Sequence, residues 1–157
     1  FETCADLESA GFEGFVTVRE LQGSGCVIVP KEPGVYMVVR ETSRSPEFLD
    51  TSVGGHYKDK DPTVSRETLH QKWVKDIPVL YIGETGNLRE RIDLLIRFGQ
   101  GEPVGHWGGR YVWQVADHHK FLICWKVVNN PRLVERDLIS QFKQQYNGKR
   151  PFANLRD

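Results

Sequence analysis

Two charged residues interrupt the apolar faces of the two most regular helical patterns in this 157-residue chain. At about 100° per residue, Arg91 falls inside the apolar arc of a helix expected over residues 88–98. Glu135 falls inside the apolar arc of a second helix, expected over 131–146. A buried guanidinium or carboxylate needs a partner. Arg91 must therefore be paired, extend its guanidinium to water, or face a cleft that binds an anion. Glu135 needs a metal, an arginine or a set of hydrogen-bond donors, and in the simplest case the two side chains pair with each other.

The elements that must position these side chains are short strands and helices. Apolar runs predict strands at residues 26–29, 34–39, 79–83 and 121–128. Asn87 is a good N-cap for the helix that carries Arg91, and Glu90 is its expected capping-box partner. Pro131 opens the last helix. The chain is therefore expected to contain both strands and helices.

Three further stretches have their own signatures. A short helix is expected over residues 6–10, and residues 99–109 form a glycine-rich loop. Residues 111–115 are ambiguous between strand and helix. Residues 40–76 are rich in Ser, Pro, Gly, Asp and Lys and predict a long surface excursion with at most one helix, near 67–74.

The amino-acid composition indicates a protein with a buried core and no membrane-spanning segment. With 39% hydrophobic and 27% charged residues, the chain can bury a core, and it contains no run of about 18 apolar residues that would span a bilayer. Its start resembles no signal peptide. The three cysteines are widely spaced and odd in number, which indicates buried free thiols and a cytoplasmic protein.

The net charge is zero, yet it is polarised along the chain. Residues 1–39 hold two basic and six acidic side chains, whereas residues 117–157 hold eight basic and four acidic ones. A local basic patch toward the C-terminal end is therefore expected.

Five sequence elements follow one another in an order that resembles the GIY-YIG nuclease superfamily. They are Gly34-Val35-Tyr36, Tyr81-Ile82-Gly83, Asn87-Leu88 with Arg91, Glu135 with Leu138-Ile139, and Tyr146-Asn147. The resemblance covers about residues 34–154 and includes both off-pattern charges. It implies a single α+β domain over 1–157 with a small three-stranded antiparallel sheet flanked by helices. Residues 1–33 would be an N-terminal extension, 40–76 an insertion between the tyrosine motifs, and 129–157 the C-terminal helix and tail.

The resemblance also implies an activity. Members hydrolyse nucleic-acid phosphodiesters with one divalent cation, here Mg²⁺ or Mn²⁺, and DNA is favoured over RNA. Carried over by position, Tyr36 would be the general base or would align the attacking water, and Tyr81 would assist it. Arg91 would hold the scissile phosphate, and Glu135 would bind the metal.

Three departures from the family pattern affect the expected site. The two motif tyrosines lie 45 positions apart, which is unusually far. Leu95 occupies the position where several members have a His, so we expect His106 of the glycine-rich loop to take over that role and to approach a phosphate closely. The C-terminal Asn has two candidates, Asn147 and Asn154, of which Asn154 is slightly favoured.

The remaining candidate residues would contact the nucleic acid. Basic residues expected against the phosphate backbone are Arg110, Lys143, Lys149, Arg150 and Arg156. Possible stacking aromatics are Tyr57, Trp107 and Trp113. No zinc finger or helix-turn-helix pattern is present, so a protein partner could supply specificity. Two other functions stay open: an inactive nucleic-acid-binding module of the same fold, and a protein-interaction domain.

Overall fold

The computed structural model describes residues 1–157 and has an α+β architecture. Its single antiparallel sheet has the strand order β1-β4-β2-β3. The strands are β1 (Glu13–Thr17), β2 (Gly34–Val39), β3 (Val79–Thr85) and β4 (Leu122–Val127). The helices are α1 (Cys4–Ser9), α2 (Val18–Ser24), α3 (Arg66–Lys72), α4 (Leu88–Gly99) and α5 (Pro131–Gln145), with 3₁₀ segments η1 (Trp107–Gln114) and η2 (His118–Lys120).

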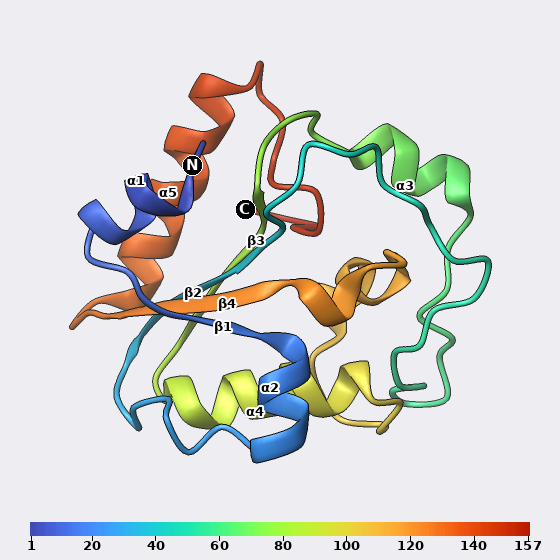
Figure 1. Cartoon of the computed structure of the whole chain (residues 1–157), viewed down its shortest axis with the longest axis horizontal. Coiled ribbons are helices and arrows are strands. Elements are labelled where there is room, and N and C mark those ends of the chain that lie inside the picture. Colours follow the sequence, from blue (N-terminus) through green and yellow to red (C-terminus); the bar gives the residue numbers. More distant parts are fainter.

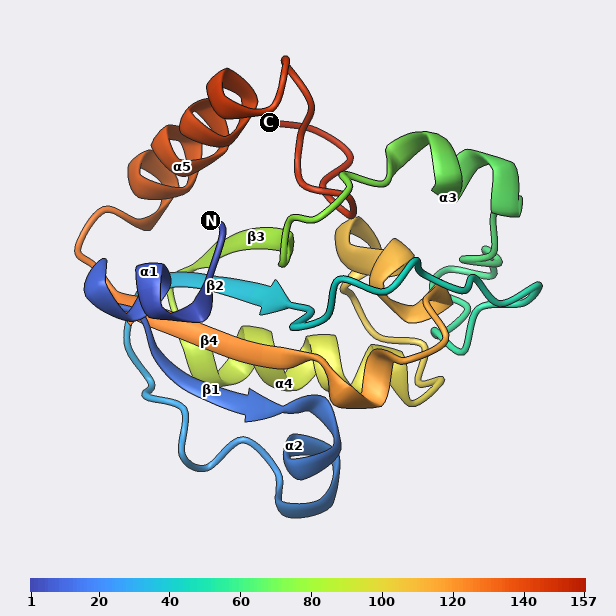
Figure 2. The same cartoon turned by 45° about the horizontal axis from the view of Figure 1, so that its top comes forward.

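The sheet separates two apolar clusters. Helices α2 and α4 pack on one face, and α1 and α5 pack on the other (Figures 1 and 2). All of β2 is buried, and its side chains alternate between the faces. Val35 and Met37 face α1 and α5, whereas Tyr36 and Val38 face α4. The tyrosine of the first motif therefore points to the same side of the sheet as the helix that carries Arg91.

The prediction of a three-stranded sheet is wrong, because β1 from the expected N-terminal extension adds a fourth strand next to β4. A bulge at Phe15 and a positive φ of +98° at Gly14 interrupt the alternation by which a strand is recognised in sequence. Gly14 is needed there, since a Cβ on it would lie 2.5 Å from the Trp125 ring.

The strand expected at residues 26–29 is also absent. The segment is a turn in which Val27 is 70% exposed. The Arg89 guanidinium holds it by donating hydrogen bonds to the carbonyls of Val27 and Val29, at 2.8 and 2.7 Å. A short apolar run is ambiguous without its tertiary surroundings, and here two of its residues stay in water.

The excursion over 40–76 contains only one helix, α3, as predicted. It is nevertheless anchored, because Phe48 and Leu69 are buried in the cluster on the α4 side. The buried Gln114 side chain donates to the carbonyls of Leu49 and Val64 and accepts the Val64 N–H. Residues 40–76 are therefore packed against the rest of the domain and do not form a free surface loop.

The helix predictions agree well with the structure. The Asn87 cap is confirmed, since its side chain accepts the Glu90 N–H at 3.2 Å, although the Glu90 side chain returns no bond. Pro131 begins α5, and the ambiguous stretch 111–115 lies largely in η1. All three cysteines are free, with Cys4 only half-buried. No helix combines the length and the apolarity needed to cross a membrane.

Candidate active site

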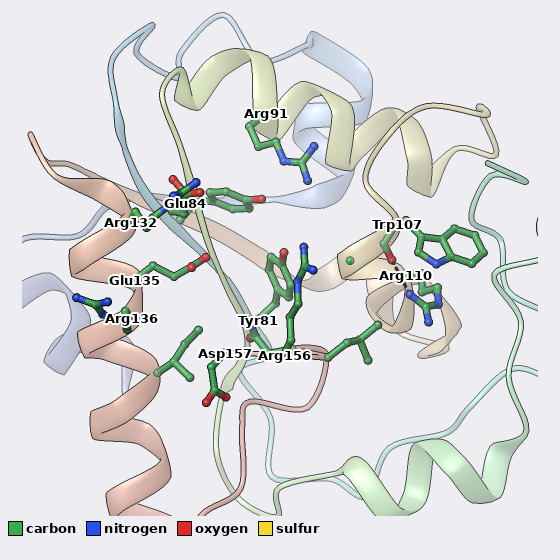
Figure 3. Close-up of a pocket in the computed structure, with 15 residues that line it drawn as sticks. Tyr81, Glu84, Arg91, Trp107, Arg110, Arg132, Glu135, Arg136, Arg156 and Asp157 are labelled. Atoms are coloured by element: carbon green, nitrogen blue, oxygen red, sulfur yellow. Dashed lines mark hydrogen bonds between the residues drawn. The ribbon is translucent and has the colours of Figure 1, made fainter. Parts of the chain in front are cut away.

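A pocket of about 900 Å³ opens along the edge strand β3. Figure 3 shows Glu84, Arg132 and Glu135 on the α5 side and Trp107 with Arg110 on the opposite side, with Tyr81 and Arg156 between them. Eight of the predicted residues line this pocket: Tyr36, Tyr81, Arg91, Trp107, Arg110, Glu135, Asn154 and Arg156. The structure thus brings together residues from β2, β3, α4, η1, α5 and the C-terminal tail.

The two motif tyrosines are diagonal neighbours on the α4 face of the sheet. Tyr36 lies opposite Gly83 and Tyr81 lies opposite Val38, and the two phenol ring centroids are 6.0 Å apart. A Cβ on Gly83 would lie 2.4 Å from Cζ of Tyr36. The glycine of the second motif is therefore what allows the ring of the first motif to lie across β3.

Tyr36 is only 1% exposed, and its hydroxyl shares a hydrogen bond of 2.8 Å with Nε2 of His106. Burial raises the pKa of Tyr36 well above its ordinary value. His106 is fully buried, and burial together with the nearby Arg91 lowers its pKa to about 3. At neutral pH the pair is therefore an uncharged phenol beside an uncharged imidazole.

His106 does not have the place expected for it. Instead of approaching a phosphate from a loop, it contacts Tyr36 from behind the pocket, and its Nδ1 has no hydrogen-bond partner. A Cβ on Gly109 would lie 2.8 Å from Cε1 of His106 and 3.7 Å from Cδ1 of Leu95. The imidazole thus lies close to Leu95, one helical turn after Arg91, although it comes from another segment.

Arg91 is half-buried, and its Nη1 donates to the Gly105 carbonyl at 2.6 Å. No carboxylate lies within ion-pair distance of it. The alternative in which Arg91 and Glu135 form a structural salt bridge is therefore wrong for this structure. The guanidinium keeps donors directed into the pocket, where an anion could accept them.

Glu135 is half-buried and has neither a hydrogen bond nor an ion pair. Burial, and next the negative charge of Glu84, raise the pKa of Glu135 from 4.5 to about 7. The positive charges of Arg132 and Arg156 offset only part of this rise, and neither guanidinium forms an ion pair with Glu135. No group of three or more His, Cys, Asp or Glu side chains surrounds a common point. A divalent ion here would be held by Glu135, with Glu84 nearby, and would keep waters, which suits Mg²⁺.

Five arginines line the pocket without a carboxylate partner, namely Arg91, Arg110, Arg132, Arg136 and Arg156. Of the five basic residues expected to contact the phosphate backbone, only Arg110 and Arg156 line the pocket. Lys143 and Arg150 pair with Asp157 at 2.9 and 2.6 Å, and neither they nor Lys149 line the pocket. Sequence reasoning missed Glu84, Arg132 and Arg136, although Arg132 is spaced three residues before Glu135 on the same helix face.

The two candidate asparagines have different positions. Asn154 is buried, accepts the Ile82 N–H and donates to the Ile82 carbonyl, both at 2.9 Å. It therefore attaches the C-terminal tail to the open edge of β3. Asn147 is exposed in the turn after α5, with φ of +57°, and does not line the pocket. The structure therefore does not bring Asn147 together with the other candidate residues.

No protein-family model matches this chain, and no curated protein or solved structure does so either. The resemblance to the GIY-YIG superfamily therefore rests only on the five sequence elements named above and on their order along the chain.

Proposed function

We propose that this protein is a divalent-metal-dependent endonuclease that hydrolyses phosphodiester bonds of DNA. The observation that carries the proposal is one pocket in which the unpaired Glu135 carboxylate lies on one wall and the unpaired Arg91 guanidinium on another, with Tyr81 between them. These groups come from three different elements, α5, α4 and β3. Their order in sequence resembles that of the GIY-YIG nucleases.

Arg91 binds the scissile phosphate in this proposal. Its planar guanidinium matches two phosphate oxygens and is already fixed by the Gly105 carbonyl. Because it is preorganised in a half-buried site, it stabilises the extra negative charge of the transition state without having to reorganise.

Glu135, with Glu84 beside it, provides the negative charge that would hold the divalent cation. When bound, such an ion polarises a phosphate oxygen and supplies a more acidic water. The half-buried, partnerless state of Glu135 fits this task, since a cation would offset the cost of ionising it.

Tyr36 acts in this scheme as a hydrogen-bonding group and not as the general base. Its pKa is raised by burial, and the neutral His106 offers no charge that would favour a phenolate. The His106 ring nitrogen fixes the orientation of the Tyr36 hydroxyl. Tyr81, which is 8% exposed and lines the pocket, is the second phenol in reach of a water or phosphate.

The nature of the substrate follows from the arginines. Arg132, Arg136 and Arg156 add three positive charges beside Glu135, more than a single phosphodiester needs. A polyanion whose neighbouring phosphates lie along these side chains fits such a pocket.

The test is nicking of supercoiled plasmid with Mg²⁺ or Mn²⁺, with single-stranded DNA and RNA in parallel. Wild type is expected to cut, and Glu135→Ala, Arg91→Ala and Tyr36→Phe are expected to lose most activity while staying folded. Arg97→Ala is the matched control, because Arg97 is on the same helix as Arg91 but pairs with Asp93 and Glu102 outside the pocket.

Two outcomes contradict the proposal. Salt-dependent binding of nucleic acid without metal-dependent cleavage would indicate the inactive binding module instead. Equal cleavage by wild type and Glu135→Ala would show that the activity does not belong to this site.

A further inference from the structure

The wall of the pocket opposite Glu135 is a stacked pair of side chains. The Arg110 Cζ atom lies 4.6 Å from the Trp107 ring centroid, and Arg110 Nη1 donates to the Trp107 carbonyl at 3.1 Å (Figure 3). Arg110 has no carboxylate partner. Its flat guanidinium is therefore held over the indole by contacts within η1 and not by an opposite charge.

This stacked wall lies directly beside the reacting groups. A Cβ on Gly108, the residue after Trp107, would be 3.9 Å from the Tyr81 hydroxyl. The hydroxyl and the indole thus border the same space, and no side chain at position 108 stands between them.

The pocket is larger than a phosphate and a hydrated cation require. Its volume of about 900 Å³ is that of a site which encloses a whole small molecule. The pocket lining includes the apolar side chains of Trp107 and Leu155, both of which pack against the main core. Burial also lowers the pKa of Arg110, which reflects partial removal of its guanidinium from water. A partly dehydrated aromatic and cationic surface favours a nucleobase.

We propose that Trp107 and Arg110 stack on the base of an unpaired nucleotide whose phosphodiester lies at Arg91 and Tyr81, which makes single-stranded DNA the preferred substrate. In a duplex each base faces its partner strand and reaches such a wall only after unpairing and flipping out. This inference rests on the proposed function, because it uses the same pocket.

The test compares one oligonucleotide as a single strand and as a fully paired duplex. Fluorescence anisotropy with Ca²⁺ in place of Mg²⁺ measures the dissociation constants. Wild type is expected to bind the single strand at least about 10-fold more tightly than the duplex. Trp107→Ala should weaken single-strand binding about 10-fold and change duplex binding little, as expected for loss of one stacked base.

Two variants control for folding and charge. Trp107→Phe keeps an aromatic face and should retain most of the single-strand affinity. Arg97→Ala removes a charge that pairs with Asp93 and Glu102 outside the pocket, and it should leave the preference for the single strand unchanged. Equal affinity for both DNA forms in wild type, or an equal loss on both forms in Trp107→Ala, would overturn the inference. Tighter binding of single-stranded RNA would overturn the choice of DNA.

Cleavage assays on the same two DNAs with Mg²⁺ test the base-stacking proposal and the proposed endonuclease activity separately. If the protein cuts neither DNA but still prefers the single strand in a Trp107-dependent way, the proposed endonuclease activity is refuted and base stacking on Trp107 and Arg110 is not. If the protein cuts duplex and single strand equally well, and Trp107→Ala does not change this, only the base-stacking proposal is refuted.

Discussion

The Tyr36 hydroxyl and Nε2 of His106 lie 2.8 Å apart beneath the pocket, and their hydrogen bond joins residues 70 positions apart in the chain. Both side chains are almost completely buried, so neither meets bulk water. The bond fixes which way the phenol points, so in the proposed mechanism His106 is a positioning residue that acts through Tyr36.

Removal of His106 is expected to lower kcat for DNA cleavage about 10-fold or more and to leave KM nearly unchanged, because Tyr36 loses its orientation but the phosphate contacts remain. His106→Gln, whose amide can still bond the phenol, should restore part of the rate that His106→Ala loses. Since His106 stays neutral, with a pKa of about 3, the wild-type rate should show no step near pH 6.5 due to this residue. A kcat for His106→Ala equal to that of wild type would refute the positioning role.

Replacement of Gly83 by Ala is expected to destabilise the protein by about 1–3 kcal/mol, because the new Cβ would overlap the Tyr36 ring. Cleavage should fall with it, since the phenol must move. Urea denaturation measures the stability. Gly86→Ala is the control, because a Cβ on Gly86 would meet no atom within 4 Å. Equal stability of the two variants would contradict the packing argument.

Glu135→Gln is expected to stabilise the metal-free protein at pH 8 while abolishing cleavage. The pKa of Glu135 is raised from 4.5 to about 7, so the folded state favours the protonated carboxyl. This contribution to stability is fully present below pH 4.5 and is lost as the pH rises through about 7. After allowance for solvent exposure, the gain at pH 8 should be about 1–2 kcal/mol.

Thermal melting in EDTA at pH 8 and pH 4.5 measures this effect. The variant should melt higher than wild type at pH 8 and at a similar temperature at pH 4.5. Added Mg²⁺ should stabilise wild type but not the variant. A variant less stable than wild type at pH 8 in EDTA would show that Glu135 has a favourable partner in the folded protein.

Asn154→Ala is expected to cost about 2–3 kcal/mol, because both backbone groups of Ile82 lose a buried hydrogen bond. Cleavage should also fall, as the tail that carries Arg156 detaches from β3. Asn147→Gly should keep both stability and activity, since its positive φ suits glycine. The reverse result in urea denaturation and nicking assays would place the functional asparagine at position 147.

Arg132→Ala and Arg136→Ala should each reduce the slope of log affinity against log salt by roughly 0.7–0.9, as expected for loss of one phosphate contact. Arg97→Ala should not change the slope, because Arg97 pairs with Asp93 and Glu102 and lies outside the pocket. Binding isotherms over a series of salt concentrations measure these slopes. An unchanged slope for both arginine variants would remove α5 from the nucleic-acid interface.

Local patterns determined much of this protein. The strands that carry Tyr36 and Tyr81, the helix cap at Asn87, and the off-pattern positions of Arg91 and Glu135 follow from periodicity and capping, which depend on near neighbours in the chain. The bulged strand β1 and the exposed turn at 26–29 did not follow, because a bulge and a short apolar run are resolved only by what packs against them.

Only the tertiary structure decided which residues share the pocket. Three sets of contacts join distant segments or different elements. They are the hydrogen bond between Tyr36 and His106, the closeness of Glu84 to Glu135, and the pairing of Lys143 and Arg150 with Asp157. Spacing along the chain carries no information about such contacts. By itself, the sequence determined which charged side chains lie on apolar helix faces and therefore need a partner. The packing of α4, η1 and α5 around β3 decided which of these side chains are left without a partner in the protein and can bind a ligand.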